Sequence, residues 1–401
     1  MDGLDRARRV ETDAAAMSTR AAVVVPARRH ALAVSVDNVS PSWFTSVMGT
    51  GILALAATLS PIALPGLRGV GVALWLADTA LLAALLLLWA MQALRHPHRI
   101  AASLHDPAVA QTWGAPPMAC FTIATGFLVI GAPLFGTARC LPYAEALWLL
   151  GVAGSLFSIL SMPYLMFTRH EVSTETTYGS WLLPVVPPIV ASVPGALLAS
   201  RWPVALRADM LALTYALWGM GIILSGIIIV LFYARLAYHK VPAGALVTTL
   251  WLVVGPLGQS IAGINALGTA ASAVWPTLGP ALGAAGIIYG LPVWGFGLYW
   301  LTLAILMTVR TARRHLPFTL GWWAFTFPVG VLTTGTYALY ARTHASLFAA
   351  VGLLLLALLA TMWALVAAHT VRHSLRHVAV TAPSPSPVAP SVPVLDASLA
   401  L

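Results

Sequence analysis

Long apolar runs dominate the chain, and short breaks that contain arginine, proline or other polar residues separate them. A helix needs about 20 mainly apolar residues to cross the hydrocarbon core of a bilayer. The polar breaks divide the apolar runs into ten predicted transmembrane helices, near 40–63, 70–94, 116–136, 142–168, 180–200, 208–234, 243–270, 282–309, 318–341 and 345–370. The pattern therefore predicts an all-α integral membrane protein.

The two ends of the chain differ in composition from the region between them. Residues 1–38 contain six arginines and no apolar run long enough to span a bilayer, so we predict a disordered basic tail. Residues 373–401 are rich in Pro, Ser, Ala and Val, and we predict a second disordered tail there. Residues 39–372 then form one ten-helix transmembrane domain.

The basic residues orient the predicted helices. With the N-terminus inside, sixteen of the 21 lysines and arginines lie in inner loops and in the two tails, and five lie in outer loops. Because cytoplasmic loops carry the excess of Lys and Arg, we predict that both termini are cytoplasmic. This is the pattern of a multi-pass protein of the plasma (inner) membrane.

The odd-numbered predicted helices are interrupted near mid-membrane by glycine or proline and contain no charged residue. The interruptions are Met48–Gly51, Thr122–Gly126, Pro184–Pro188, Gly255–Ser260 and Phe327–Gly330. Irregular backbone at membrane depth is tolerated where it is buried in protein or lines a cavity. We therefore predict five helical hairpins around a central pore, with the odd helices as an inner ring. The alternative is that these residues only permit close helix packing.

The amino-acid composition argues against a water-soluble protein. Of 401 residues, 59% are hydrophobic and 8% are charged, and the mean hydropathy is +0.87, whereas soluble domains carry roughly 25% charged residues. The net charge of +9 comes from arginines in tails and short loops, which is a topology signal rather than a nucleic-acid-binding face. We expect membrane lipid around the chain and no nucleic acid as a partner.

Several kinds of chemistry are missing. No GxxxxGK[ST] phosphate loop occurs, which argues against an ATP-driven pump. The histidines fall in tails, loops and helix ends, so we expect neither a metal site nor a cofactor.

Asp78 is the one carboxylate well inside a predicted span. An ionisable residue at membrane depth is a functional hypothesis by default. The structural alternative is that Asp78 bonds a neighbouring helix or compensates the positive N-terminal end of its own helix.

The predicted inner ring indicates the charge of the solute. Its helices contain Thr, Ser, Gln and breaks but no carboxylate. Broken helices present N–H groups and positive dipole ends, and arginines at the mouths attract anions. We therefore predict a pathway for a small anionic solute. Its predicted lining residues are Thr50, Thr125, Pro187, Gln259, Gly330 and Thr334.

Four segments resemble the tellurite-resistance/dicarboxylate transporter family, which includes tellurite-resistance proteins, malate permeases, sulfite efflux pumps and plant slow anion channels. They are Trp43–Gly51, Trp181–Pro188, Gly255–Gln259 and Trp322–Pro328, and they resemble the family's first, fifth, seventh and ninth helices. The resemblance implies ten helices around a pore, a homotrimer with one pore per subunit, and an aromatic plug on the ninth helix. It also implies passive anion conduction, proton-linked dicarboxylate uptake or sulfite export.

Phe327 is the predicted plug. It shares a helical face with Gly330 and Thr334, which leave space and a polar contact, and Pro328 allows the helix to kink beside it. Phe325 points about 200° away, toward large side chains, and we expect it to pack against lipid or a neighbouring helix. The alternative for Phe327 is an ordinary packing role.

The sequence leaves the substrate open. We rank C4-dicarboxylates such as malate first, with sulfite, tellurite and small inorganic anions as rivals. The absence of an ionisable relay on the inner helices favours a channel-like pathway. An integral-membrane transferase is the alternative from another class, and Glu171 and Glu175 are its nearest candidate residues. A membrane receptor or scaffold would need an appended soluble domain.

Overall fold

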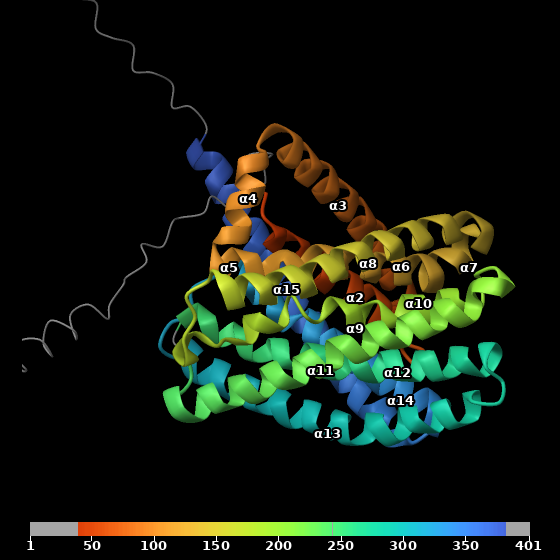
Figure 1. Cartoon of the computed structure of the whole chain (residues 1–401). Coiled ribbons are helices and arrows are strands. Elements are labelled where there is room, and N and C mark those ends of the chain that lie inside the picture. The colour runs from red at the N-terminus through yellow and green to blue at the C-terminus, as the bar shows by residue number, and fades with distance from the viewer. Residues whose placement is uncertain (1–38, 243, 382–401) are drawn as a thin grey trace, which may run out of the picture. The chain divides into compact units, whose positions relative to one another are not determined.

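The computed structural model describes residues 39–242 and 244–381, and every regular element in these two stretches is a helix (Figure 1). The predicted N-terminal tail, residues 1–38, and residues 382–401 of the predicted C-terminal tail lie outside the described part. The described residues from 39 to 373 belong to one compact unit, and the contacts discussed below lie within it.

Seven helices in the described part are long and apolar enough to cross a membrane. They occupy Leu67–Arg95, Pro107–Phe135, Thr137–Thr168, Val204–His239, Gly244–Val274, Gly279–Ala312 and Ser346–Ser374. The other three predicted spans, near 40–63, 180–200 and 318–341, contain shorter α-helices. These are α2 (Phe44–Thr58), α9 (Pro187–Val190) with α10 (Ser192–Ala199), and α14 (Phe327–Thr343). The structure thus shows seven candidate spans where the sequence predicts ten.

Five long helices are exposed along much of their length. These outer helices are α3 (Leu67–Arg95), α8 (Thr137–Thr168), α11 (Arg207–His239), α13 (Gly279–Ala312) and α15 (Ser346–Thr381). Only 22% to 33% of their most apolar windows is buried. Because the exposed residues are largely apolar, the outer helices present a surface that suits lipid.

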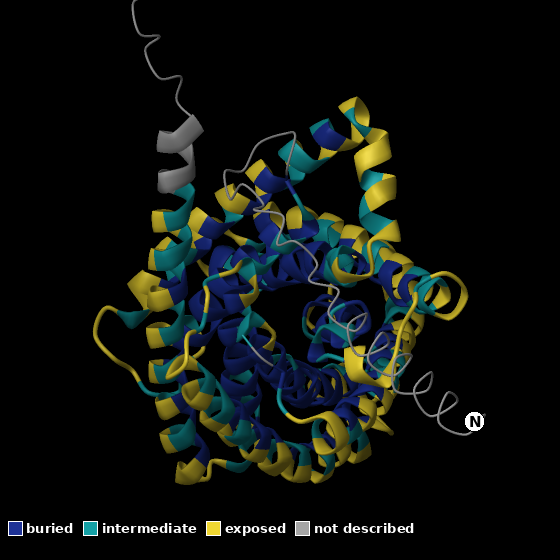
Figure 2. Ribbon diagram, turned by 90° about the vertical axis from the view of Figure 1, so that its left-hand side faces the viewer, coloured by how far each residue is buried: buried dark blue, intermediate teal, exposed yellow. Residues whose placement is uncertain are grey.

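Five buried segments alternate with the outer helices along the chain. We call them the inner segments, and they comprise residues 41–58, 111–135, 179–199, 244–274 and 320–343. In the most apolar window of Gly244–Val274, 83% of the residues are buried, and all twelve residues of α6 (Ala115–Gly126) are buried. Figure 2 shows the buried ribbon on the inside of a ring of helices whose outward faces are exposed.

Each inner segment begins as a 3₁₀-helix and continues as an α-helix. The 3₁₀-helices are η1 (Pro41–Trp43), η2 (Gln111–Gly114), η5 (Gly179–Leu182), η7 (Gly244–Val253) and η8 (Leu320–Phe325), and η7 leads into α12 (Val254–Val274). Proline stands in the first turn of α6, α9 and α14. Its missing N–H and fixed φ are tolerated there. Several of the breaks expected from proline are therefore places where an α-helix begins.

Shorter elements complete the described part. They are α4 (Pro97–His105), α5 (Pro107–Ala110), the π-helical turn η3 (Phe127–Gly131), α7 (Ala132–Phe135), η4 (Thr174–Thr176) and η6 (Val204–Leu206). Of these, η3 and α7 follow α6 and complete the inner segment 111–135, and α4 and α5 precede that segment in the chain.

Glycine allows the inner segments to approach one another closely. A Cβ atom on Gly258 of α12 would lie 2.6 Å from the Cα of Leu332 in α14, and one on Gly49 of α2 would lie 2.7 Å from the Trp323 ring of η8. Real Cβ atoms essentially never come that close. The backbones of α2, α12 and η8–α14 are therefore held in fixed contact.

Candidate functional site

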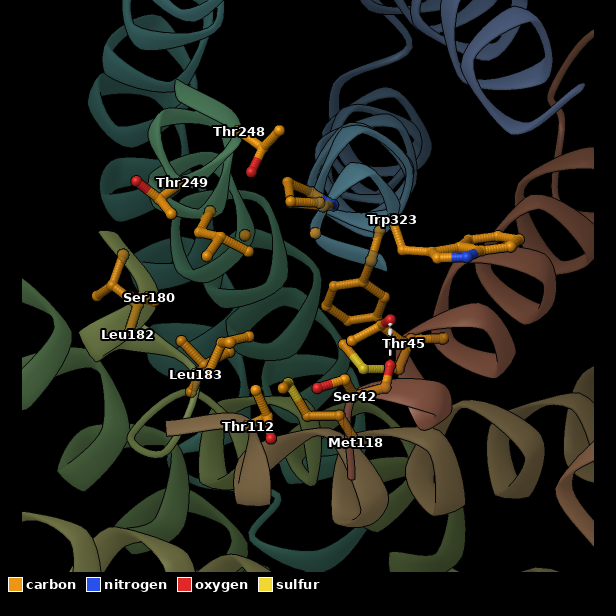
Figure 3. Close-up of a pocket in the computed structure, with 18 of the residues that line it drawn as sticks. Ser42, Thr45, Thr112, Met118, Ser180, Leu182, Leu183, Thr248, Thr249 and Trp323 are labelled. Carbon is orange, nitrogen blue, oxygen red and sulfur yellow. Dashed lines mark hydrogen bonds between the residues drawn. The ribbon is translucent and has the colours of Figure 1, made fainter. Parts of the chain in front are cut away.

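Two cavities lie among the inner segments, and all their lining residues except Leu59, which directly follows α2, come from these five segments. The first, which we call cavity A, has a volume of about 200 Å³ and is lined by the 3₁₀-helices and by the first turns of the α-helices that follow. Figure 3 shows hydroxyl-bearing side chains from four 3₁₀-helices or the residues next to them arranged around it. These residues are Ser42, Thr45, Thr112, Ser180, Thr248 and Thr249.

The second cavity, which we call cavity B, has a volume of about 330 Å³ and is lined by later residues of the same segments. Thr125, Gln259 and Thr334, three of the predicted lining residues, face it. It extends to Leu59 at the end of α2, whose side chain is exposed, and to Arg342 near the end of α14. Cavity B is therefore reached from that end of the inner segments.

Phe327 is the one described residue that lines both cavities. Its side chain is only 5% exposed, so the residue stands between two open spaces rather than at their rim. Pro328 follows it in the first turn of α14 and lines cavity A. The structure thus places the predicted plug and its proline at the boundary between the two cavities.

Phe325 lies elsewhere. It lines neither cavity, is 3% exposed, and packs edge-on against the ring of Trp251 in η7 with 4.9 Å between the ring centroids. Its partner is thus a neighbouring inner segment, which is one of the two surroundings that the sequence predicts for it. The two phenylalanines have separate surroundings, so they can be tested separately.

Most threonine hydroxyls in cavity B already donate to the backbone of their own helix. Thr122, Thr125 and Thr269 each donate to the carbonyl four residues earlier, at 2.8 to 3.0 Å. Gln259 differs, because its amide has no hydrogen-bond partner among the described residues although its side chain is 5% exposed. Its N–H groups are free to donate into the cavity.

Arg342 is the single charged residue that lines cavity A or cavity B within the described part, and neither lining contains a carboxylate. From the sequence, Arg342 is one of the five basic residues of the predicted outer loops. Its spacing from Phe327, Thr334 and Ala338 follows the helical period, and this signal places all four on one face of α14. The electrostatics of the two cavities are therefore those of neutral polar groups and one cation.

Three predicted lining residues lie outside both cavities. The Thr50 hydroxyl accepts a hydrogen bond from the indole N–H of Trp363 in α15 at 2.9 Å. Pro187 begins α9 and is buried. A Cβ on Gly330 would lie 2.6 Å from Cγ1 of Ile52, so Gly330 allows α14 to pack against α2. All three contribute to packing among helices.

Asp78 lies behind the wall of cavity B. Its side chain is 1% exposed, and neither carboxyl oxygen has a hydrogen-bond partner in the described part of the chain. A Cβ on Gly51 would lie 2.6 Å from Asp78 Oδ2 and equally close to Thr122, which faces the cavity. Asp78 is eleven residues into α3, three turns from its start at Leu67. Neither structural explanation, a bond to a neighbouring helix or a helix-end position, is therefore present, and Asp78 stays a predicted functional residue.

Comparison with known proteins gives the chain relatives along nearly its whole length. A family model described as "Voltage-dependent anion channel" matches residues 38–371. A protein of Arthroderma otae named sulfite efflux pump SSU1 is 34% identical over 87% of this chain and 94% of its own length. The protein of that name from Trichophyton rubrum is 34% identical over 85% and 92%. An uncharacterized transporter of Methanocaldococcus jannaschii is 27% identical over 82% and 92%.

Single cysteines test the assignment of lining residues. Thr125→Cys faces cavity B and should react with a small hydrophilic thiol reagent about tenfold faster than Thr50→Cys, because Trp363 covers Thr50. The native Cys120 and Cys140 are buried, so their background reaction should be slow. Mass spectrometry of the purified protein after timed labelling gives both rates. Equal rates at the two positions would contradict the assignment.

Proposed function

The chain belongs to the voltage-dependent anion channel family, and on this premise we propose that it exports sulfite across the plasma membrane through cavities A and B. Membership makes it an anion transporter and not an enzyme. The transferase alternative has no further support, because Glu171 and Glu175 are exposed and Glu175 lies 3.8 Å from His239 rather than beside a second carboxylate.

The observation that carries the proposal is the lining of the two cavities. Among the described residues it contains hydroxyls, the side-chain amides of Gln259 and Asn265, and Arg342, but no carboxylate. A cation in this lining would find no counter-charge, whereas an anion would find a free amide donor and a guanidinium at the mouth. The N-terminal turns of several inner α-helices also face cavity A, and helix N-termini favour negative charge.

The names of the relatives favour one of the anions that the sequence leaves open. Malate, which the sequence analysis ranks first, is named for none of the relatives described above. Two proteins that match more than four fifths of this chain are named sulfite efflux pumps. We therefore propose sulfite, one of the rival anions in the ranking from the sequence, as the transported anion, and we rank malate and tellurite below it.

A passive pathway is sufficient for export. A negative cell interior drives an anion outward with about 2.3 kcal/mol per charge per 100 mV. Tenfold in concentration corresponds to about 1.4 kcal/mol, so this potential alone sustains a gradient of roughly 50-fold for a monovalent anion. A channel-like pathway with a closed resting state accounts for efflux without a coupled ion.

We propose ten membrane spans, which are the seven candidate spans and three more. We propose that α2, α9–α10 and α14, each with its preceding 3₁₀-helix, also cross the bilayer, so that five hairpins surround the pathway. Both termini are then cytoplasmic, and cavity A faces the cytoplasm. The homotrimer implied by the family resemblance stays a prediction, which light scattering of the purified protein checks.

Topology is tested with reporter fusions after Pro65, between α2 and α3, and after Thr381, at the end of α15. With ten spans the two positions are on opposite sides of the membrane, Pro65 outside and Thr381 inside. Paired reporters active on either side of the membrane show the location of each fusion. A shared location for the two fusions would exclude this arrangement.

Sulfite transport is tested with the purified protein in liposomes. We expect sulfite efflux to exceed malate efflux, and Gln259→Leu to reduce sulfite efflux about tenfold, because a hydrogen bond to a charged group contributes roughly 1.5–3 kcal/mol. Gln92→Leu is the matched control, since Gln92 is a buried glutamine of α3 that lines neither cavity. Malate efflux equal to or above sulfite efflux would refute the choice of substrate.

The gate is tested in the same liposomes with Phe327→Ala. Removal of the ring joins cavities A and B, and we expect sulfite flux to rise at least about tenfold, because a ring in a narrow uncharged lumen blocks by sterics and dewetting. Phe325→Ala is the control. It should lower stability through a packing loss of roughly 3–5 kcal/mol without opening the pathway. Unchanged flux in folded Phe327→Ala, or a larger rise in Phe325→Ala, would assign the gate elsewhere.

A further inference from the structure

A third cavity lies outside the pathway, between the C-terminal ends of the outer helices α11 and α13. We call it cavity C, and its volume is about 520 Å³. Met307, Arg310 and Thr311 of α13 line one side, and Leu236 and the turn after α11 line the other. Since only 28% and 22% of the most apolar windows of these two helices is buried, the cavity lies at the outer surface, where helices of this exposure meet lipid.

Cavity C has a strongly basic lining. Lys240, Arg310, Arg314 and His315 line it, and no carboxylate does so among the described residues. None of the four forms an ion pair within the described part of the chain. The helix dipoles favour cations at C-terminal ends. That effect explains why basic residues occur here. It does not explain why four of them surround one hollow whose described lining contains no acidic side chain.

The turn that carries Lys240 is held in place from within the protein. Arg235 is 8% exposed and donates one hydrogen bond to the Glu175 carbonyl at 3.1 Å and another to the Lys240 carbonyl. Its guanidinium also lies over the Tyr178 ring, 5.1 Å from the centroid. These bonds fix the backbone of Lys240, and its ammonium group takes no part in them.

The backbone at the cavity is in an uncommon conformation. Lys240 has φ of 66° and His315 has φ of 132°, and they are two of the three non-glycine residues with positive φ in the described part. This region of φ is costly for residues with a side chain and occurs often at ligand sites. Both residues line cavity C, so the strain lies at the two turns that close it.

The lining has an apolar part beside the charged one. Leu236, Val241, Pro242 and Met307 contribute it. A free inorganic anion would use only the basic part, whereas a phospholipid would place its phosphate there and its glycerol and upper acyl chains against the apolar part. Basic pockets between membrane helices on the cytoplasmic side are suited to anionic lipid head groups.

We propose that cavity C, which the topology proposed above places on the cytoplasmic side, binds the phosphate of an anionic phospholipid from the leaflet on that side. Arg310 and Arg314 are the phosphate ligands, because the guanidinium fork matches phosphate oxygens, and Lys240 adds charge from the other side. The proposal is independent of the transported substrate, since neither cavity A nor cavity B shares a residue with cavity C.

The site also adjoins the pathway along the chain. Gly244 lines cavity C and begins η7, whose Thr248 and Thr249 line cavity A. His315 precedes η8, which ends two residues before Phe327. A bound lipid therefore holds the two turns from which two of the pathway walls start.

The test is lipid binding by the full-length purified protein, measured by native mass spectrometry with equal amounts of dioleoyl phosphatidylglycerol and dioleoyl phosphatidylcholine. We expect a preference for phosphatidylglycerol that Arg310→Gln with Arg314→Gln weakens about 30-fold, from about 1 kcal/mol for each charge removed. Arg313→Gln is the matched control, because Arg313 ends the same helix and is exposed but does not line the cavity. Its preference should stay within about twofold of the wild type.

Three outcomes would overturn the proposal. The first is a wild-type protein that binds the two lipids equally. The second is an equal loss in Arg313→Gln and in the double variant, which would show nonspecific surface charge. The third is displacement of phosphatidylglycerol by millimolar inorganic phosphate, which would show a site for free phosphate. Lys240→Gln supplies a second variant if the double variant does not elute as a single folded species, and it should weaken the preference about fivefold.

Discussion

A backbone that crosses hydrocarbon must satisfy its hydrogen bonds within the protein, and the arrangement of the inner segments follows from this requirement. Each of the five contains a junction between 3₁₀-helix and α-helix, and η7 alone runs for ten residues. Such junctions carry less regular hydrogen bonds than a continuous α-helix. They therefore lie inside the ring, where the outer helices cover them and where the cavities begin. The outer helices, which face the surroundings, are long α-helices.

The same requirement shapes the chemistry of the pathway. Thr122, Thr125 and Thr269 donate to their own helices. Their hydroxyl groups therefore make the lumen more polar, but they offer it no free donor. Among the described lining residues, six side chains keep a polar group without a hydrogen-bond partner: Ser42, Ser180, Gln259, Asn265, Trp323 and Arg342. We expect a lumen with so few charges to conduct by exclusion and weak attraction rather than by tight binding. The proposed aromatic plug would be sufficient to close such a lumen, because no strong binding site needs to be satisfied on either side.

Close packing at glycine connects these features. Gly330 lets α14 approach Ile52 of α2, and Gly258 lets α12 approach Leu332 of α14. Phe327 stands at the start of the same α14, so the position of its ring depends on both contacts. The turn after α11 and the turn after α13 lead into η7 and η8, and the proposed lipid at cavity C lies against those two turns. Short stretches of chain thereby connect the proposed gate to the proposed lipid site.

Much of this organisation can be predicted from the amino-acid sequence. Apolar runs of more than 20 residues have few alternatives to a membrane helix, and the breaks rich in Gly and Pro marked the segments that line the cavities. The helical period of residues 318–341 placed Phe327 and Thr334 on one face and Phe325 on another. Cavity B and the Trp251 contact agree with that division, although Phe325 belongs to η8 and not to α14.

Other features of the lining depend on contacts between segments that are far apart in the sequence. Trp363 covers Thr50 although 313 residues separate them, and Ile52 occupies the space that Gly330 leaves open. A helical period tells which residues share a face, but it does not tell which neighbour that face meets. Arg342 joined the lining for the same reason, because a charge near a helix end is equally consistent with a loop. The sequence alone therefore determined the class of protein and its inner segments, and tertiary packing decided which of their residues face the open space.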